Sequence, residues 1–246
     1  MMNDVELAIH IADMAGRLLL DLRATGQFEG KALGVEGDRI ANAYIMETLR
    51  RERPEDAILS EEEANDVARC AVERVWIVDP LDGTREYGEG RSDWAVHIAL
   101  AVGGRATVGA VALPGLDLIL NSQDPLPLPA TPDRLRMLVS RTRPAAEAVA
   151  VAEALGAELV PMGSAGAKAM AVVRGEADIY LHSGGQYEWD NCAPAAVAQA
   201  AGLHCSRIDG SALTYNHENP WLPDLLICPV ELADTVLRLV RDATAR

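Results

Sequence analysis

The segment Trp76-Ile77-Val78-Asp79-Pro80-Leu81-Asp82-Gly83-Thr84 joins a short apolar run to two aspartates and a turn. Val75 to Val78 predict a buried strand, because a short apolar run bounded by turn residues is typical of one. The proline cannot donate a ladder hydrogen bond, so we expect the strand to stop at Asp79. Asp82-Gly83 favours a tight turn, and Thr84 can cap a following helix. This strand end would carry two carboxylates and free backbone N–H groups, a combination that suits divalent cations and a phosphate.

Two further acidic sites lie far from this segment along the chain. Glu61 and Glu62 follow the apolar pair Ile58-Leu59, and Asp190 follows Trp189 at the start of a predicted helix. Aspartates beside a turn are more often turn or cap residues than ligands, and an acidic run is most often a solvated surface. Three acidic sites, each at the end of a predicted element, favour a shared metal site instead.

The chain resembles the inositol monophosphatase superfamily in three signatures: Glu61-Glu62, Asp79 to Thr84, and Trp189-Asp190. Members of that superfamily are Mg²⁺-dependent, lithium-sensitive phosphatases, and the resemblance covers nearly the whole chain. Three more stretches are similar to its 3'(2'),5'-bisphosphate nucleotidase branch, namely Arg85-Glu86-Tyr87, Gly163 to Lys168 and Glu188 to Pro194. Bacterial members of that branch act on 3'-phosphoadenosine 5'-phosphate, a by-product of sulfate assimilation.

Composition restricts the classes of partner. The chain has 246 residues, 49% hydrophobic residues, 22 Lys and Arg against 37 Asp and Glu, and a net charge of −15. This charge disfavours a nucleic acid polymer as partner, although bound cations reverse the local field for a small phosphorylated substrate. There is no apolar stretch of membrane-spanning length, no basic N-terminal region of a signal peptide, and no paired spacing among Cys70, Cys192, Cys205 and Cys228. We therefore expect a cytoplasmic protein with reduced thiols and no membrane partner.

The order of predicted elements indicates an α/β (α+β) fold. Residues 4–23 predict a helix, and Asp38 is placed to cap a second one. Residues 94–102 and 106–113 predict a hairpin across Gly103-Gly104, followed by a strand at 116–120. Beyond the Pro-rich segment 124–132, strands at 135–139, 158–160, 177–182 and 224–228 alternate with helices at 144–155, 165–174, 190–201 and 231–243.

We therefore expect an N-terminal metal-binding half (residues 1–123), a Pro-rich link (124–132) and a C-terminal substrate-binding half (133–246). The resemblance implies that the two halves form the layered α-β-α-β-α sandwich of the inositol monophosphatase and fructose-bisphosphatase type.

The resemblance also implies a metal centre and a mechanism. The ligands would be Glu61, Asp79, Asp82, Asp190 and the carbonyl of Leu81. They would hold two or three Mg²⁺ ions, with Mn²⁺ as a substitute and Li⁺ as an inhibitor. Thr84, Asp38 and Glu61 would position the attacking water, and the N–H groups of Gly83 and Thr84 would bind the ester phosphate.

A second phosphate needs donors away from the metals. Candidate substrate-binding residues are Ser140, Arg141, Gly163, Ser164, Lys168 and Asp190, of which the first two follow a predicted strand end. Arg143 and Lys31 are interpreted as surface charges. His182, Tyr187 and Trp189 are candidates for a wall beside the base, with core packing as the alternative.

Three functions remain open. The resemblance favours hydrolysis of the 3'-phosphate of 3'-phosphoadenosine 5'-phosphate, with the sulfated 3'-phosphoadenosine 5'-phosphosulfate as a further candidate. Inositol 1-phosphate or fructose 1,6-bisphosphate hydrolysis on the same scaffold is the alternative, and a non-catalytic metal-stabilised protein is the third. A haloacid-dehalogenase type is disfavoured, because Asp79 and Asp82 are separated by two residues rather than one. The oligomeric state is open, a homodimer included.

Overall fold

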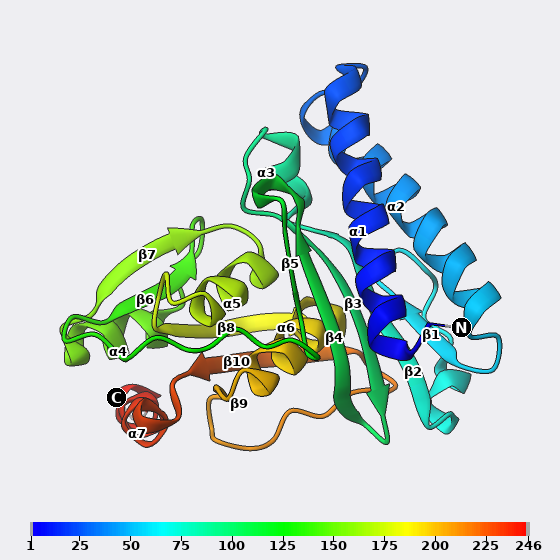
Figure 1. Cartoon of the computed structure of the whole chain (residues 1–246). Helices are drawn as coiled ribbons and strands as arrows, with labels where there is room; N and C mark the ends of the chain where they lie inside the picture. The colour runs from blue at the N-terminus through cyan, green and yellow to red at the C-terminus, as the bar shows by residue number, and fades with distance from the viewer. Residues whose placement is uncertain (1, 245–246) are drawn as a thin grey trace.

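The computed structural model describes residues 2–244, which form seven α-helices and two mixed β-sheets (Figure 1). The α-helices are α1 (Asp4–Thr25), α2 (Gly30–Glu52), α3 (Thr84–Gly88), α4 (Ala146–Leu155), α5 (Ala165–Val173), α6 (Glu188–Ala200) and α7 (Val230–Thr244). No helix within the described range is long and apolar enough to cross a membrane. The four cysteines are free thiols.

The first sheet has the order β1-β2-β3-β4-β5 and uses residues before the Pro-rich segment. Its strands are β1 (Ala57–Ser60), β2 (Arg74–Asp82), β3 (Ala95–Val102), β4 (Arg105–Leu113) and β5 (Leu118–Asn121). β1 pairs with β2 in parallel, and the other pairs are antiparallel. The predicted hairpin across Gly103-Gly104 is confirmed, and both glycines have positive φ angles that suit a tight turn.

The second sheet has the order β7-β6-β8-β10-β9 and uses residues after the Pro-rich segment. Its strands are β6 (Arg136–Ser140), β7 (Glu158–Met162), β8 (Ile179–Tyr187), β9 (His204–Ser206) and β10 (Trp221–Cys228). β6 pairs in parallel with both β7 and β8, whereas β10 is antiparallel to β8 and β9. The short strand β9 was not predicted, because three residues carry too little periodicity to be recognised.

Three cores fill the spaces between five layers, so the predicted α-β-α-β-α sandwich is confirmed. Side chains alternate along β2: Trp76 and Val78 pack toward α1 and α2, and Val75 and Ile77 pack toward α5 and α6. Helices α5 and α6 fill the space between the sheets, and α4 and α7 cover the outer face of the second sheet (Figure 1). Because the first sheet is covered on both faces, its central strands β2 and β3 are nearly continuous buried runs rather than alternating ones.

The prediction that Asp38 caps a second helix is wrong. Helix α2 begins at Gly30, so Asp38 lies in its interior and is buried. The Gly-rich stretch before Asp38 is helical because tertiary contacts outweigh its low helix propensity. A Cβ atom on Gly34 would lie 2.5 Å from Thr84 Cγ2, and one on Gly37 would lie 3.0 Å from Leu81 Cδ2. The two glycines therefore let α2 pack closely against the segment that contains Asp79 to Thr84.

Two details of that segment also differ from expectation. Strand β2 continues through Pro80 to Asp82 instead of stopping at Asp79, and Thr84 is the first residue of α3 while Gly83 occupies the cap position. The register shifts between Asp79 and Asp82, which pair with His97 and Ala95 respectively. The proline is tolerated because it lies within this irregularity, where a ladder hydrogen bond is already missing.

Candidate active site

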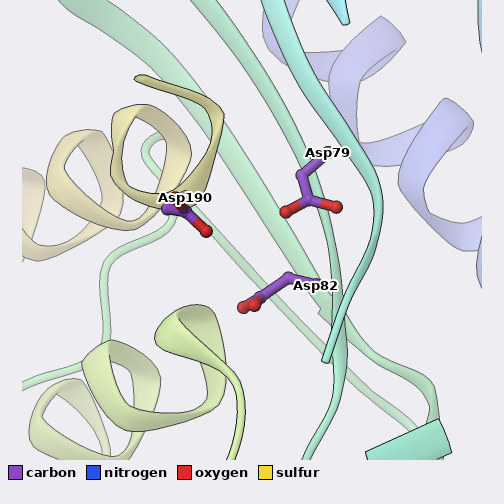
Figure 2. Close-up of side chains that lie close together, drawn as sticks. All are labelled: Asp79, Asp82 and Asp190. Carbon is purple, nitrogen blue, oxygen red and sulfur yellow. The ribbon is translucent and has the colours of Figure 1, made fainter. Parts of the chain in front are cut away.

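Three carboxylates converge between the two sheets. Asp79, Asp82 and Asp190 each offer an oxygen atom, and these atoms all lie within 4.8 Å of one another. Figure 2 shows the three side chains pointing toward a shared space, two from the end of β2 and one from the start of α6. The two acidic sites are 108 residues apart in the sequence, so the packing of the two sheets brings them together.

The irregularity in β2 explains how Asp79 and Asp82 share one site. Residues three positions apart on a regular strand point to opposite faces of the sheet. Asp79 and Asp82 are three positions apart but pair with His97 and Ala95, which are two positions apart, so β2 holds one extra residue here and both carboxylates can face the same side. Asp79 also accepts a hydrogen bond from the N–H of Leu81 over 3.0 Å, which holds the local bend.

Asp82 is held by the N-terminal turn of α5. Its Oδ2 atom accepts from Ser164 Oγ over 2.5 Å and from the N–H of Gly166 over 2.6 Å, and Oδ1 accepts from the N–H of Ala165 over 3.2 Å. Burial opposes ionisation, but these donors and His97 hold the pKa of Asp82 at about 2. Asp82 is therefore a fixed carboxylate that links the first sheet to the second half of the chain.

The other two carboxylates are destabilised in their charged form. Burial is the main cause that raises the pKa of Asp79 well above its usual value, and the negative charge of Glu61 adds to this rise. Burial, followed by the charge of Asp82, raises the pKa of Asp190 to about 6, even though Asp190 accepts a hydrogen bond of 2.5 Å from the N–H of Tyr187. Several buried carboxylates that repel one another are the arrangement that a divalent cation would stabilise.

Glu61 and Asp38 lie at the side of this cluster. Desolvation is the main cause that raises the pKa of Glu61 to about 7, the charge of Asp190 adds to it, and the nearby Asp79 side chain opposes it. Burial, followed by the charges of Glu62 and Glu61, raises the pKa of Asp38 to about 8. Asp38 Oδ1 is buried and has no hydrogen-bond partner within the described residues. The structure thus brings Asp38 from the interior of α2 to the expected region of the site.

Thr84 lies between Asp38 and the end of β2. Its hydroxyl donates to the carbonyl of Leu81 over 3.1 Å, and its side chain lies close enough to Asp38 to oppose the rise in the pKa of that carboxyl. Gly83 has φ 89°, and a Cβ atom there would lie 3.0 Å from Ser164 Cβ and 3.3 Å from the Trp94 backbone. Glycine is therefore required where the chain passes between the two halves.

A polar cavity of about 310 Å³ opens beside Asp82 and Gly83. Its other walls come from the segment after β6 and from the turn before α5, and they include the predicted residues Ser140, Arg141, Gly163 and Ser164. Arg141 does not present a free charge, because its guanidinium lies 2.8 Å from both Glu86 Oε1 and Glu89 Oε2. The prediction that Arg141 binds a phosphate directly therefore conflicts with its pairing.

Lys168 lies elsewhere than expected. Its side chain is buried, and its ammonium group donates to the carbonyls of Gly163 and Ser164, the latter over 2.7 Å. Burial lowers the pKa of Lys168. Lys168 thus supports the turn that contacts Asp82 from beneath, and does not line the cavity.

The aromatic candidates form a separate feature. The rings of Tyr187 and Trp189 stack with centroids 4.7 Å apart at an angle of 5°, and Tyr187 is 44% exposed. His182 Nε2 lies 3.0 Å from the carbonyl of Gly185. A role beside a nucleobase stays a prediction for these residues.

His97 was missed by the sequence reading. It is fully buried on β3, with Nδ1 2.9 Å from the carbonyl of Trp189 and Nε2 3.2 Å from Asp82 Oδ2. A carbonyl only accepts, so Nδ1 donates to it, which orients the ring between two ligand-bearing segments. Its one signal in the sequence is a polar residue within the apolar run Ala95 to Leu100.

The fold and site together define a layered α/β protein whose sheets meet at a cluster of carboxylates. The sequence model of the inositol monophosphatase family matches residues 23–244 of this chain. The chain belongs to this family, in which metal dependence is general, and the oxygen-rich cluster of Asp79, Asp82 and Asp190 fits a divalent cation.

Relatives at higher sequence identity have more specific names than the family as a whole. The chain is 48% identical to the "3'-phosphoadenosine 5'-phosphate phosphatase" of Mycobacterium leprae over 98% of this chain and 94% of the relative. It is 49% identical to the protein of that name from Mycobacterium tuberculosis over 93% and 90%. Similarity to the "3'(2'),5'-bisphosphate nucleotidase CysQ" of Escherichia coli is 29% over 75% and 80%.

Solved structures share the fold. An inositol monophosphatase from Thermotoga maritima superposes with a TM-score of 0.81 at 19% identity, covering 99% of each chain. CysQ from Bacteroides thetaiotaomicron superposes with a TM-score of 0.78 at 24% identity, covering 92% of this chain and 97% of that one.

Proposed function

We propose that this chain is a Mg²⁺-dependent phosphomonoesterase that hydrolyses the 3'-phosphate of 3'-phosphoadenosine 5'-phosphate. The observation that carries the proposal is the opening of an arginine-walled cavity directly beside Asp82 and Gly83 of the carboxylate cluster. Such a cavity suits a substrate with a second anionic group. The names of the mycobacterial relatives support the same substrate.

In this proposal Asp79, Asp82, Asp190, Glu61 and the carbonyl of Leu81 hold two or three Mg²⁺ ions. When bound, such ions lower the pKa of water and neutralise phosphate oxygens. Mn²⁺ would satisfy the same oxygen ligands, and Li⁺ is expected to inhibit.

Three side chains of the protein then prepare the attack. Thr84 would accept a hydrogen bond from the water, because its own hydroxyl hydrogen is donated to the carbonyl of Leu81. The raised pKa values of Asp38 and Glu61 would fall beside bound cations, so that the ionised carboxylates could accept the proton of the water. The N–H groups of Gly83 and Thr84 orient the ester phosphate. The nucleoside would then extend past Ser164 and Gly163 into the cavity.

The experiment is phosphate release with Mg²⁺ from 3'-phosphoadenosine 5'-phosphate, inositol 1-phosphate and fructose 1,6-bisphosphate, each with and without Li⁺. We expect the nucleotide to have the highest kcat/KM and Li⁺ to inhibit its hydrolysis. Equal or better turnover of the inositol or sugar phosphate would contradict the substrate and keep the metal site. Mg²⁺ binding without phosphate release would indicate a non-catalytic protein.

A second substrate, the metabolic role, the location and the oligomeric state are further parts of this proposal. Hydrolysis of 3'-phosphoadenosine 5'-phosphosulfate is tested by adding it to the substrate series, because it keeps the 3'-phosphate. A role in sulfur metabolism, a cytoplasmic location and a homodimer stay predictions.

A further inference from the structure

We propose that Arg143 binds the phosphate that is not hydrolysed, which makes it the residue that selects bisphosphorylated over monophosphorylated nucleotides. This inference rests on the proposed function and names the subsite for its second phosphate. Arg143 would bind the phosphate, which is the role that the sequence analysis predicted for Arg141, and Arg141 would instead stabilise the cavity wall.

The cavity beside the carboxylate cluster has three arginines on its walls. Asp82 and Gly83 line one part of the cavity of about 310 Å³, and Arg85, Arg141 and Arg143 line another. A ligand with one phosphate at the cluster can therefore place a second anionic group against the arginines. The chemical class that fits is a nucleoside with two phosphate monoesters.

Two of these arginines are already neutralised. Arg141 lies 2.8 Å from Glu86 Oε1 and 2.8 Å from Glu89 Oε2, and Arg85 Nε lies 2.9 Å from Glu89 Oε1. Glu86 is buried, and a Cβ atom on Gly163 would lie 2.3 Å from its Cγ atom. Releasing Arg141 toward a phosphate would leave the buried Glu86 carboxylate without a partner, which is costly. Arg141 therefore holds the cavity wall together.

Arg143 differs from both. Among residues 2–244 no carboxylate lies within 4.0 Å of its guanidinium, and its side chain is exposed toward solvent at the cavity. Two hydrogen bonds of backbone N–H groups fix the turn that carries Arg143. The N–H of Arg143 donates to Ser140 Oγ over 3.2 Å, and the N–H of Arg141 donates to the carbonyl of Met162 over 3.1 Å. A guanidinium on a defined turn can bind a phosphate dianion through two parallel hydrogen bonds.

The test compares two substrates that differ only in the second phosphate, 3'-phosphoadenosine 5'-phosphate and adenosine 3'-phosphate. We expect Arg143→Gln to lower kcat/KM for the bisphosphate by roughly tenfold to a hundredfold, the range for a charged hydrogen bond, and to leave the monophosphate nearly unchanged. Arg141→Gln should lower kcat/KM for both substrates, because it disturbs the shared wall. Arg105→Gln, a change of an exposed arginine on β4, is the matched control and should alter neither.

The outcomes separate this inference from the function on which it rests. A wild-type enzyme that prefers the bisphosphate, with that preference intact in Arg143→Gln, overturns the inference alone. Equal losses on both substrates in Arg143→Gln overturn it as well. A wild-type enzyme with no preference for the bisphosphate contradicts the inference and the proposed substrate together.

Discussion

The hydroxyl of Ser164 donates to the Oδ2 atom of Asp82 over 2.5 Å, and this contact joins the two halves of the chain at the site. Ser164 is also the cap of α5, because its hydroxyl accepts from the N–H of Ala167 over 2.9 Å. One side chain thus begins a helix and orients a carboxylate of the cluster. Contacts behind a metal ligand commonly set both its orientation and the affinity for the metal.

Ser164→Ala is expected to lower both stability and Mg²⁺ affinity. Loss of the cap and of the hydrogen bond should reduce the free energy of unfolding by about 1–2 kcal/mol. Mg²⁺ affinity should fall by roughly tenfold or more, because Asp82 loses a partner that orients it. Denaturant unfolding and Mg²⁺ titration calorimetry measure the two effects. The exposed Ser211→Ala serves as control; equal Mg²⁺ affinity in both variants would contradict the role of Ser164.

Asp82→Asn should remove most of the turnover. The amide keeps the volume of the side chain but loses the charge that holds a cation and pairs with His97. We expect kcat to fall by at least about a hundredfold, since the metal contribution amounts to several kcal/mol. Phosphate release is the measurement, with the exposed Asp209→Asn as control. Normal turnover by Asp82→Asn would rule out Asp82 as a ligand.

Stabilisation by Mg²⁺ should increase with pH. The pKa values of Asp38, Glu61 and Asp190 are raised to about 8, 7 and 6, mainly by burial. The folded protein therefore binds more protons than the unfolded one between about pH 4 and pH 8, and without metal these groups lower the stability progressively as the pH rises from about 4 to about 8. Mg²⁺ binds the ionised carboxylates and removes this cost.

The measurement is the rise in Tm on adding Mg²⁺ at pH 6, 7 and 8. We expect the largest rise at pH 8 and the smallest at pH 6. NaCl at matched ionic strength is the control, because a chain of net charge −15 is also stabilised by screening. A rise that is independent of pH would show that Mg²⁺ binds elsewhere.

Gly34→Ala should impair catalysis through a steric clash. In an open helix this change would stabilise by about 1 kcal/mol, but here the new methyl would lie 2.5 Å from Thr84 Cγ2. We expect kcat to fall by roughly tenfold or more, because α2 or Thr84 must move.

The double variant Gly34→Ala/Thr84→Ser supplies the control. Serine keeps the hydroxyl of Thr84 and lacks the clashing methyl, so part of the lost kcat should return relative to Gly34→Ala alone. If the change Thr84→Ser lowers kcat by the same factor in the wild-type chain and in Gly34→Ala, the contact between positions 34 and 84 does not limit catalysis.

Lys168→Met should affect all nucleotide substrates alike. Methionine keeps most of the volume but leaves the carbonyls of Gly163 and Ser164 without their donor. We expect the free energy of unfolding to fall by about 1–3 kcal/mol, and kcat/KM to fall for mono- and bisphosphorylated substrates together. Unfolding and the two-substrate comparison measure this, with Arg105→Gln as the surface control. A loss confined to the bisphosphate would instead indicate direct contact with the second phosphate.

Local patterns predicted most of the elements. The Gly103-Gly104 hairpin and the helix that begins near Asp190 lie within two or three residues of their expected places. Asp38 was misplaced because a glycine-rich stretch has low intrinsic helix propensity, and only its packing against Thr84 makes it helical. His97 was overlooked because an apolar strand with one polar residue gives no indication of what that residue contacts.

The sequence by itself determined which carboxylates could gather, because Asp79 and Asp82 lie in one short segment and Asp190 begins a recognisable helix. Only the tertiary structure decided which cations are available to a substrate. Lys168 is buried beneath its turn, Arg141 pairs with acids more than 50 residues away, and Arg143 stays unpaired in the described chain. Charge at a site depends on burial and on partners distant in sequence, and neither is encoded in local patterns.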